Sequence, residues 1–399
     1  MAQGTANPPV STLNGREEPL RRTIVAAHLG AEHRDGMNLV WSAGLDLAWR
    51  ELTRLAGGGP ITLPGAGEDD PAAALVGALN DGAVNAGRAG TLDEGAYVAR
   101  AGIHTPELVA ELVEELRRKF GGDAAPRLLA EPPSPGGFLA YACLAKQLVF
   151  DPPLVRGTWP LSFRGDSRQS SYVHSFGLWE TWDEPPELWD PRLRSIVVHY
   201  PRWTDAEVDA MSEEEIDRMY NERTFVVEVL PADRGDRLIV ACVEPGATLR
   251  ETVQRAMGRL DDRAEEHPRA RLDPREKIQV PCIDLDVRQL YPELQGKLFA
   301  GAQLAAGMLG EVLQSVRFRL DEGGVTLRAE ARGHGLCAPP RELVCERSFL
   351  VLLLRRGSPV PFFALWVAND ELLVPAPEPE LIREMRSEGM LDEGPSRGA

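Results

Sequence analysis

The chain has 399 residues, of which 43% are hydrophobic and 26% are charged, and that length can bury a large core. The formal net charge is −17 and the pI is near 5.0. This balance argues against nucleic acid and anionic membrane surfaces as partners, because both bind basic faces. No apolar run reaches the roughly 18 residues that a membrane-spanning helix needs.

The first residues and the cysteines suggest a reducing environment. Residues 1–9 lack the charged and then apolar pattern of a secretory signal. The cysteines are odd in number and have no Cys-x-x-Cys spacing, so they predict neither a disulfide framework nor a zinc site. They are Cys143, Cys242, Cys282, Cys337 and Cys345. We therefore expect a cytoplasmic protein without metal or cofactor. The basic residues are nearly all arginine, which is typical of a GC-rich bacterial gene.

The first 60 residues are predicted to be a disordered lead followed by two helices. Residues 1–18 form the lead. Apolar residues at helical spacing mark 20–29 and 39–55. The second helix meets a strong stop at Gly57-Gly-Gly-Pro60.

Two further helices are predicted by a proline that follows a capping residue. Asp70 precedes a helix over 71–79, and Thr105 precedes a helix over 106–120. The apolar run 139–150 fits either a buried strand or a helix, because periodicity does not separate the two.

The middle of the chain opens with an acidic segment rich in tryptophan and proline, about residues 175–223, which we interpret as an insertion. Its capping-box patterns, Thr204-x-x-Glu207 and Ser212-x-x-Glu215, predict one or two helices within 205–219. Next comes a predicted strand pair, then a helix and a further strand. They span 225–231, 237–243, 249–265 and 278–287.

The region 312–367 is the most informative. A strand over 312–320 meets the corner Asp321-Glu322-Gly323-Gly324. Strict alternation follows: Val325, Leu327, Ala329 and Ala331 are apolar or small, while Thr326, Arg328, Glu330 and Arg332 are polar. Alone, this predicts an ordinary half-buried strand. A Gly- and Pro-rich loop then precedes apolar runs at 348–354 and 361–367, joined by a turn.

Strands and helices mix without regular alternation, which favours an α+β fold. Several motifs in collinear order resemble those of the serpin family, from Leu20 to Val374. Asn38-Leu-Val-Trp-Ser42 resembles the family's Asn-x-x-Phe-Ser-Pro helix start. Gly157-Thr-Trp159, with Phe163, resembles the Gly-x-Trp-x-x-Pro-Phe motif.

The resemblance continues to the end of the domain. Residues 225–243 resemble the strands of the Leu-Glu-Leu-Pro-Tyr region, and 321–324 resemble the Glu-x-Gly hinge before the reactive loop. Residues 349–354 and 363–369 resemble the closing strands. The chain departs from the family at Gln314, where a His is common, and at Leu365, which replaces a Gly.

This resemblance implies a serpin-like single domain over 19–374. It would have a large central β-sheet, two smaller sheets, about eight or nine helices and an exposed reactive loop at about 322–347. An acidic tail would follow at 375–399. The resemblance also implies a sheet-opening region at Ser42, Trp159 and Gln314.

The implied activity is inhibition of a serine or cysteine protease by a suicide-substrate mechanism. The protease cuts the loop, and the cut loop inserts into the central sheet. The hinge residues would be Glu322, Gly323, Gly324, Val325, Leu327 and Ala329. In one register the apolar residues of the alternation face inward. A register counted from Gly323 turns Thr326, Arg328 and Glu330 inward instead and opposes insertion.

Counting back from Phe349 places the scissile bond at Cys337-Ala338. Counting forward from Gly324 gives Ala338-Pro339, and Leu336-Cys337 is a further candidate. A small or apolar residue before the cut suits elastase-, chymotrypsin- or subtilisin-like proteases. We expect a monomer with a protease as its partner.

Other classes stay open at this point. A non-inhibitory serpin-like binding or regulatory protein would keep the fold without the trap, and Gln314, Leu327 and Leu365 favour it. An enzyme on this scaffold has no motif in its support. Cys337 and Cys345 could form a redox clamp on the loop, although two free thiols are favoured in a reducing cell.

Overall fold

A computed structural model describes most of the chain between residues 12 and 379. The described residues are 12–13, 16–67, 69–86, 92–121, 137–146, 148–157, 159–166, 170–178, 191–199, 212, 224–233, 235–261, 264, 270–272, 276–304, 306–322 and 342–379. The expected lead up to residue 11, the acidic tail beyond 379, and the loop 323–341 lie outside them. So does nearly all of the helical segment expected at 205–219.

Three mixed sheets and two hairpins form the described β structure. The seven-stranded sheet has the order β11-β12-β13-β19-β20-β4-β3. Its strands are β11 (Ile196–His199), β12 (Phe225–Val229), β13 (Asp236–Cys242), β19 (Phe349–Arg355), β20 (Phe363–Val367), β4 (Asn38–Ser42) and β3 (Thr23–Ala26). Every residue of β4, β11, β12, β13 and β20 is buried, so this sheet is core on both faces.

The five-stranded sheet carries the longest strands. Its order is β15-β17-β6-β5, and β16 pairs with the start of β17. The strands are β15 (Ile283–Leu290), β17 (Gly307–Leu320), β6 (Gly137–Lys146), β5 (Tyr97–Ile103) and β16 (Leu298–Phe299). Near the carboxyl end of β17 this sheet contacts the seven-stranded sheet, where the Phe318 and Phe363 ring centroids lie 4.6 Å apart.

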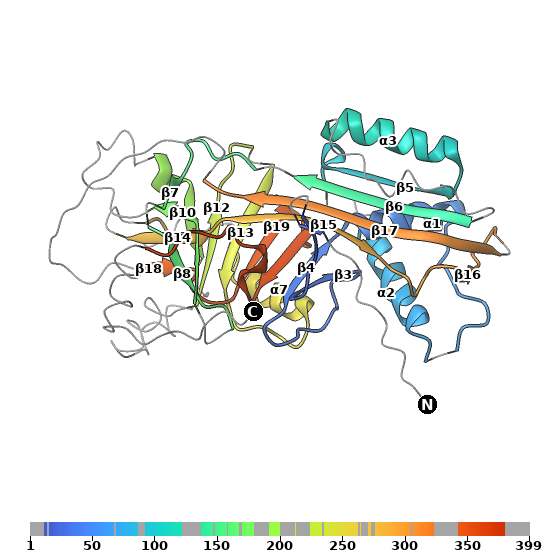
Figure 1. Ribbon diagram of the computed structural model, residues 1–399, viewed down its shortest axis with the longest axis horizontal. Coiled ribbons are helices and arrows are strands. Elements are labelled where there is room, and N and C mark those ends of the chain that lie inside the picture. Colours follow the sequence, from blue (N-terminus) through green and yellow to red (C-terminus); the bar gives the residue numbers. More distant parts are fainter. Residues whose placement is uncertain are drawn as a thin grey trace.

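The four-stranded sheet has the order β18-β14-β10-β7 and lies at the far end of the molecule from α3 (Figure 1). Its strands are β18 (Glu342–Val344), β14 (Lys277–Pro281), β10 (Ser175–Leu178) and β7 (Val155–Arg156). Two hairpins complete the β structure: β1 (Thr12–Leu13) with β2 (Arg16–Pro19), and β8 (Leu161–Phe163) with β9 (Ser171–Val173).

Helices cover both faces of the five-stranded sheet (Figure 1). On one face, α3 (Pro106–Phe120) packs Leu112 and Leu116 against β6. On the other lie α1 (Gly44–Leu55) and α2 (Pro71–Ala86), which share a core cluster with Ala140 of β6. α7 (Leu249–Met257) packs on β19 and β20. Burying one Leu or Phe side chain stabilises the fold by about 1.5–3 kcal/mol, so these faces fix the layers.

Among the residues that the structure describes, four α-helices have nine residues or more, and two short 3₁₀ helices are η1 (Glu94–Ala96) and η5 (Asp370–Leu372). The expected eight or nine helices are therefore not confirmed. No helix in the described part is long and apolar enough to cross a membrane.

Two expectations at the N-terminus are wrong. The helix expected over 20–29 is the strand β3, and the first residues of the helix expected over 39–55 form the strand β4. The two strands pair in parallel, Val25 opposite Val40. The β-branched residues of this stretch suit a sheet, and burial between β20 and the core outweighs the local helical spacing.

Most other elements are confirmed, several with different bounds. The helix at 71 extends to Ala86, the helix at 106–120 matches α3, and the helix at 249 ends at Met257. The ambiguous run at 139 is the strand β6. The strand expected over 278–287 is two strands in different sheets, β14 and β15. Within the expected insertion 175–223, residues 175–178 and 196–199 are the sheet strands β10 and β11.

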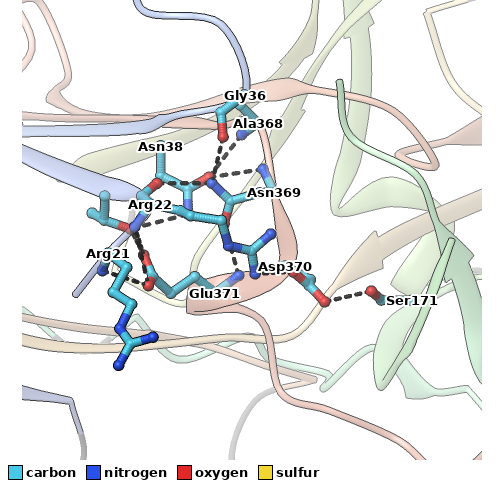
Figure 2. Close-up of polar contacts among 10 residues, drawn as sticks. Arg21, Arg22, Gly36, Asn38, Ser171, Ala368, Asn369, Asp370 and Glu371 are labelled. Atoms are coloured by element: carbon cyan, nitrogen blue, oxygen red, sulfur yellow. Dashed lines mark hydrogen bonds and ion pairs between the residues drawn. The ribbon is translucent and has the colours of Figure 1, made fainter. Parts of the chain in front are cut away.

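A polar network ties the two ends of the described chain together (Figure 2). Asn38 Nδ2 donates to Asn369 Oδ1 at 2.9 Å, and Asn38 Oδ1 accepts from the backbone of Ala368. Glu371 accepts from the backbone N–H groups of Arg21 and Arg22. These bonds give partners to the backbone N–H groups beside β3 and β20 and hold η5 on the seven-stranded sheet.

Candidate functional site

The candidate site is the seam between β6 and β17. These strands are parallel neighbours over ten register positions, from Met308 opposite Gly137 to Phe318 opposite Lys146. The other main-path pairs of this sheet, β15 with β17 and β5 with β6, are antiparallel. A strand antiparallel to β17 would therefore also be antiparallel to β6 if it lay between them.

The two faces of this seam differ. Along β17, Val316, Phe318 and Leu320 are buried, while Arg317 and Arg319 are exposed. Gln314 lies opposite Ala142, so both belong to the buried face that α1 covers. Period-two geometry then assigns the even positions of β17 from Val312 onward to the interior.

Gln314 is the polar centre of the buried face. Its Nε2 donates to Ser42 Oγ at 2.7 Å and to the Ser42 carbonyl at 3.3 Å, while its Oε1 accepts from the Tyr291 hydroxyl at 2.6 Å. All three side chains are buried. Burial raises the pKa of Tyr291 well above its usual value, and Glu293 and Asp46 add to this, so the phenol stays a donor.

The start of α1 lies directly beneath the seam. A Cβ on Gly44 would contact the Ala142 and Leu144 side chains of β6 and the Ser42 hydroxyl. Ser42 at the same time holds Gln314 of β17. The segment from Ser42 to Gly44 therefore supports both strands, and a movement of β17 away from this segment would break the bonds between Gln314 and Ser42.

The carboxyl end of β17 is held by an ion pair with the four-stranded sheet. Arg156 of β7 donates to Glu322 Oε1 at 3.2 Å, and Glu322 is only 7% exposed. Among described residues, its other oxygen, Oε2, has no hydrogen-bond partner. A buried carboxylate with one unsatisfied oxygen is costly, so this contact is a weak lock on the end of β17.

Neighbouring groups respond to this carboxylate. Burial, together with Glu322, raises the pKa of the Cys282 thiol to about 12, so that thiol is unreactive at neutral pH. Burial and Arg156 lower the pKa of His174, against the opposing effect of Glu322. His174 and Cys282 thus stay uncharged beside the ion pair at neutral pH.

Beyond Glu322 the chain leaves the described residues and returns at β18, which pairs in parallel with β14 in the four-stranded sheet. Cys345, just after β18, is fully buried, and its Sγ lies 3.8 Å from Sγ of Cys242. Cys345 thus contacts Cys242 of β13. Cys337, the other half of the expected clamp, lies outside the described residues.

The structure brings together some of the predicted site residues. Ser42 and Gln314 are directly bonded, and Glu322 lies at the end of the same strand. Trp159 is 63% exposed and takes no part in the described bonds of this pair. The remaining predicted hinge and scissile residues lie outside the described part, namely Gly323, Gly324, Val325, Leu327, Ala329, Leu336, Cys337 and Ala338.

Sequence reasoning missed Tyr291 and Arg156. Arg156 stands directly before the Gly157-Thr-Trp159 motif, which was the only signal for it. Tyr291 follows β15 and carries no motif. In the described part of the chain, no three His, Cys, Asp or Glu side chains gather where a metal ion could bind.

No family model matches this chain, and no curated protein matches it. Solved structures do match. The chain is similar to serpins. A thermophilic serpin, tengpin, in its native state is 10% identical, with a TM-score of 0.47, and the match covers 85% of this chain and 90% of that chain.

Two other structures match to a comparable extent. Serine protease inhibitor (serpin)-12 of Manduca sexta is 10% identical with a TM-score of 0.46, over 86% of this chain and 95% of its own. A thyroxine-binding globulin complex with thyroxine is 11% identical with a TM-score of 0.42, over 84% and 93%.

Proposed function

We propose that this chain is a serpin-like inhibitor of a serine or cysteine protease, and that its cut reactive loop inserts between β6 and β17. The parallel β6–β17 pair carries the proposal. It lies in the interior of the five-stranded sheet, and β17 leads directly into the segment 323–341. A segment that turns back after Glu322 would run antiparallel to β17.

The gain in stability from insertion would come from the backbone hydrogen bonds between strands. One parallel pairing of ten positions would be replaced by two antiparallel pairings, which are slightly more stable per residue. The costs are the Gln314 bonds to Ser42 and the Arg156–Glu322 contact. These bonds are fewer than the backbone hydrogen bonds that two new strand pairings would add.

The alternation of buried and exposed residues along β17 indicates the register in which the cut loop would insert. Leu320 and Phe318 are buried, and residues that face each other across antiparallel strands share a side. A connection of two residues (322–323) or four (321–324) would place Val325 opposite Leu320. Its successors Leu327 and Ala329 would then face the core. We favour this register because two-residue hairpins are the commonest connection.

The proposed cut is at Cys337-Ala338, with Leu336-Cys337 and Ala338-Pro339 as the other candidates. The proposed partner is an elastase-, chymotrypsin- or subtilisin-like protease, because a small or apolar residue precedes each cut. We further propose that residues 19–374 form one domain and that the chain acts as a monomer.

The test is incubation with a panel of such proteases, followed by denaturing gel electrophoresis. A covalent complex that survives boiling in detergent is expected, as is a higher thermal midpoint of the loop-cleaved chain. Leu327→Arg should convert the inhibitor to a plain substrate, because it would bury an unpaired charge. Thr326→Arg, on the opposite side of the same strand, is the matched control and should still inhibit.

The second candidate is a non-inhibitory serpin-like binding or regulatory protein. The observation that favours it is the closed β6–β17 pairing, together with the bond of 2.7 Å that holds Gln314 of β17 on Ser42 beneath the seam. A cleaved chain whose thermal midpoint equals that of the intact chain would replace the inhibitor proposal with this one.

A further inference from the structure

Cys242 and Cys345 are two buried thiols that meet between two sheets. Cys242 is the last residue of β13 in the seven-stranded sheet, and Cys345 directly follows β18 of the four-stranded sheet. Their Sγ atoms lie 3.8 Å apart. The backbone N–H of Cys345 also donates to the Gln279 carbonyl of β14. Cys345 therefore contacts both sheets, through its sulfur on one side and its backbone on the other.

A cavity of about 570 Å³ lies beside the pair, with walls from both sheets. Phe225 and Cys242 line it from the seven-stranded sheet, and Lys277 and Val344 line it from the four-stranded sheet. Cys242 is 7% exposed, whereas Cys345 is fully buried and does not line the cavity. A small reagent in the cavity therefore meets Cys242 before it can meet Cys345.

The pair stands at the end of a short edge strand. β18 is the edge of the four-stranded sheet, and it pairs with β14 over three register positions, from Lys277 to Gln279. Few backbone hydrogen bonds hold such a strand, so it can open locally while the rest of the sheet stays folded. A covalent bond at Cys345, the next residue, would keep the end of β18 against β13.

The thiols are close to the geometry of a disulfide. An S–S bond is about 2.05 Å long, so the two sulfurs have to approach by about 1.8 Å, which rotations about the two Cα–Cβ bonds can supply. Burial raises the pKa of the Cys345 thiol well above its usual value, so that this sulfur stays protonated at neutral pH. The first step therefore belongs to Cys242, and Cys345 completes the bond.

We propose that Cys242 and Cys345 are a redox switch, in which a peroxide converts the two thiols into a disulfide that fastens the end of β18 to β13. The Cys242 sulfur attacks one oxygen of hydrogen peroxide, the O–O bond breaks, and the other oxygen leaves as water with the thiol proton. The Cys345 sulfur then attacks the sulfenic sulfur of Cys242. The S–O bond breaks, and the departing hydroxide takes the Cys345 proton to form a second water. Two thiols are oxidised and one peroxide is reduced, and the proposal is independent of protease inhibition.

The test treats the full chain with hydrogen peroxide, which catalase then removes. The remaining thiols are alkylated, and the chain is digested without reductant for mass spectrometry. We expect two peptides joined through Cys242 and Cys345, from chains that migrate as single chains on a non-reducing gel. Dithiothreitol should separate the two peptides by thiol–disulfide exchange.

The disulfide should stabilise the fold and slow the opening of β18. Cys242 and Cys345 are 103 positions apart, and a link over so long a loop restricts the unfolded chain strongly. The thermal midpoint of the oxidised chain should therefore be about 5 °C above that of the reduced chain. Backbone hydrogen exchange of Glu342–Val344 should be at least about threefold slower after oxidation. Both changes should reverse with dithiothreitol.

Two variants separate the pair from general oxidation of the chain. Cys242→Ser removes the thiol that reacts first and keeps a side chain of similar size, so peroxide should give neither the joined peptides nor the rise in midpoint. Cys143→Ser, on β6 in the five-stranded sheet, is the matched control. It should form the disulfide and show the same rise as the parent.

Peroxide-treated parent chains without the Cys242–Cys345 peptide pair would overturn the proposal. A Cys337–Cys345 pair in its place would overturn it as well. If the disulfide forms but changes neither the midpoint nor the exchange of Glu342–Val344, the bond does not fasten β18 and the pair is no switch.

Discussion

At the scale of single residues, Glu228 is a buried charge with three side-chain partners among the described residues. Arg237 donates to its Oε2 at 2.6 Å, and Arg356 donates to Oε1 at 3.2 Å. His199 Nδ1 accepts from the backbone N–H of Asp261, so His199 Nε2 carries the proton that faces Glu228. Burial pushes the pKa of Glu228 up, but the bonds from His199 and Arg237 outweigh it and lower it to about 2.

Glu228 should therefore make the fold sensitive to acid. Its pKa of about 2 in the folded chain lies below the ordinary value of 4.5, so its stabilisation is complete above about pH 4.5 and is lost between there and pH 2. We expect Glu228→Gln to lower the free energy of unfolding at pH 7 by about 3 kcal/mol. Urea denaturation at several pH values should show the gap to the parent closing as the pH falls.

The matched control is Glu114→Gln on α3, where the carboxylate pairs with Arg117 on the surface. That change should cost no more than about 1 kcal/mol at any pH. A parent–Glu228→Gln difference that stays constant from pH 7 to pH 2 would contradict the assignment.

Gln314 should be strongly coupled to Tyr291. Gln314→Leu leaves the buried Tyr291 hydroxyl and Ser42 hydroxyl without their described partner, at about 1–3 kcal/mol each. The double variant Gln314→Leu, Tyr291→Phe should be more stable than the sum of the single losses, by about 0.5–3 kcal/mol. Denaturant unfolding of the four chains of this cycle measures the coupling. Exact additivity of the two losses would mean that the bond contributes nothing.

At the scale of elements, helix caps and turn residues in the sequence predicted the elements whose bounds depend on nearby residues. The bounds of α3 follow from the Thr105 cap, whose Oγ1 accepts from Leu108 N–H, and from Pro106 at the first helical position. The β12–β13 hairpin follows from its two apolar runs and the turn around Asp233, which accepts from Gly235 N–H.

Elements set by distant partners were not predictable in this way. β3 has four residues, too few to show a period, and its pairing with β4 comes from packing. The run 278–287 changes sheets at Cys282. There the N–H donates to the His174 carbonyl and the C=O accepts from Val374 N–H. No local pattern announces such a change of partner.

The same limit applies to the sites. Ser42 and Gln314 were predicted from the resemblance, and the structure joins them. Tyr291 carries no motif, because its role arises only where the end of β15 meets Gln314 of β17. No local pattern in a single sequence predicts such a contact between distant segments.

Glycine at 165 should be required by a close backbone approach. Gly165 has a φ of +55°, and a Cβ there would lie 2.1 Å from the Ala368 carbonyl oxygen. Gly36 has a similar φ of +66° but has nothing within 4 Å. Both alanine variants meet the left-handed penalty of about 1 kcal/mol. Gly165→Ala should lose at least about 2 kcal/mol more, measured by thermal or urea unfolding. Equal losses at the two positions would disprove the close approach.

At the scale of the whole molecule, the order of the seven-stranded sheet differs from the order of the chain. β19 and β20 lie between β13 and β4, and they are the last strands of the part of the chain that the structure describes. Without β19 and β20, β13 and β4 would each expose an unpaired strand edge to water, although all their residues are buried in the complete fold.

A chain that ends at Glu346 should therefore fail to form this sheet. We expect it to sediment as aggregate and to bind a hydrophobic dye, while a chain that ends at Pro379 unfolds at the same temperature as the full chain. The second truncation keeps the network of Asn369 and Glu371. A soluble Glu346 truncation with native-like near-ultraviolet dichroism would contradict this expectation.

The position of these strands also determines how long the sheet stays incomplete during protein synthesis. Asn38 and its partner Asn369 are 331 residues apart. At about 5–20 residues per second, a ribosome needs roughly 15–65 s to supply the second after the first. Throughout that interval β4 is on the growing chain without β20, the strand with which it pairs. The seven-stranded sheet therefore closes only near the end of translation.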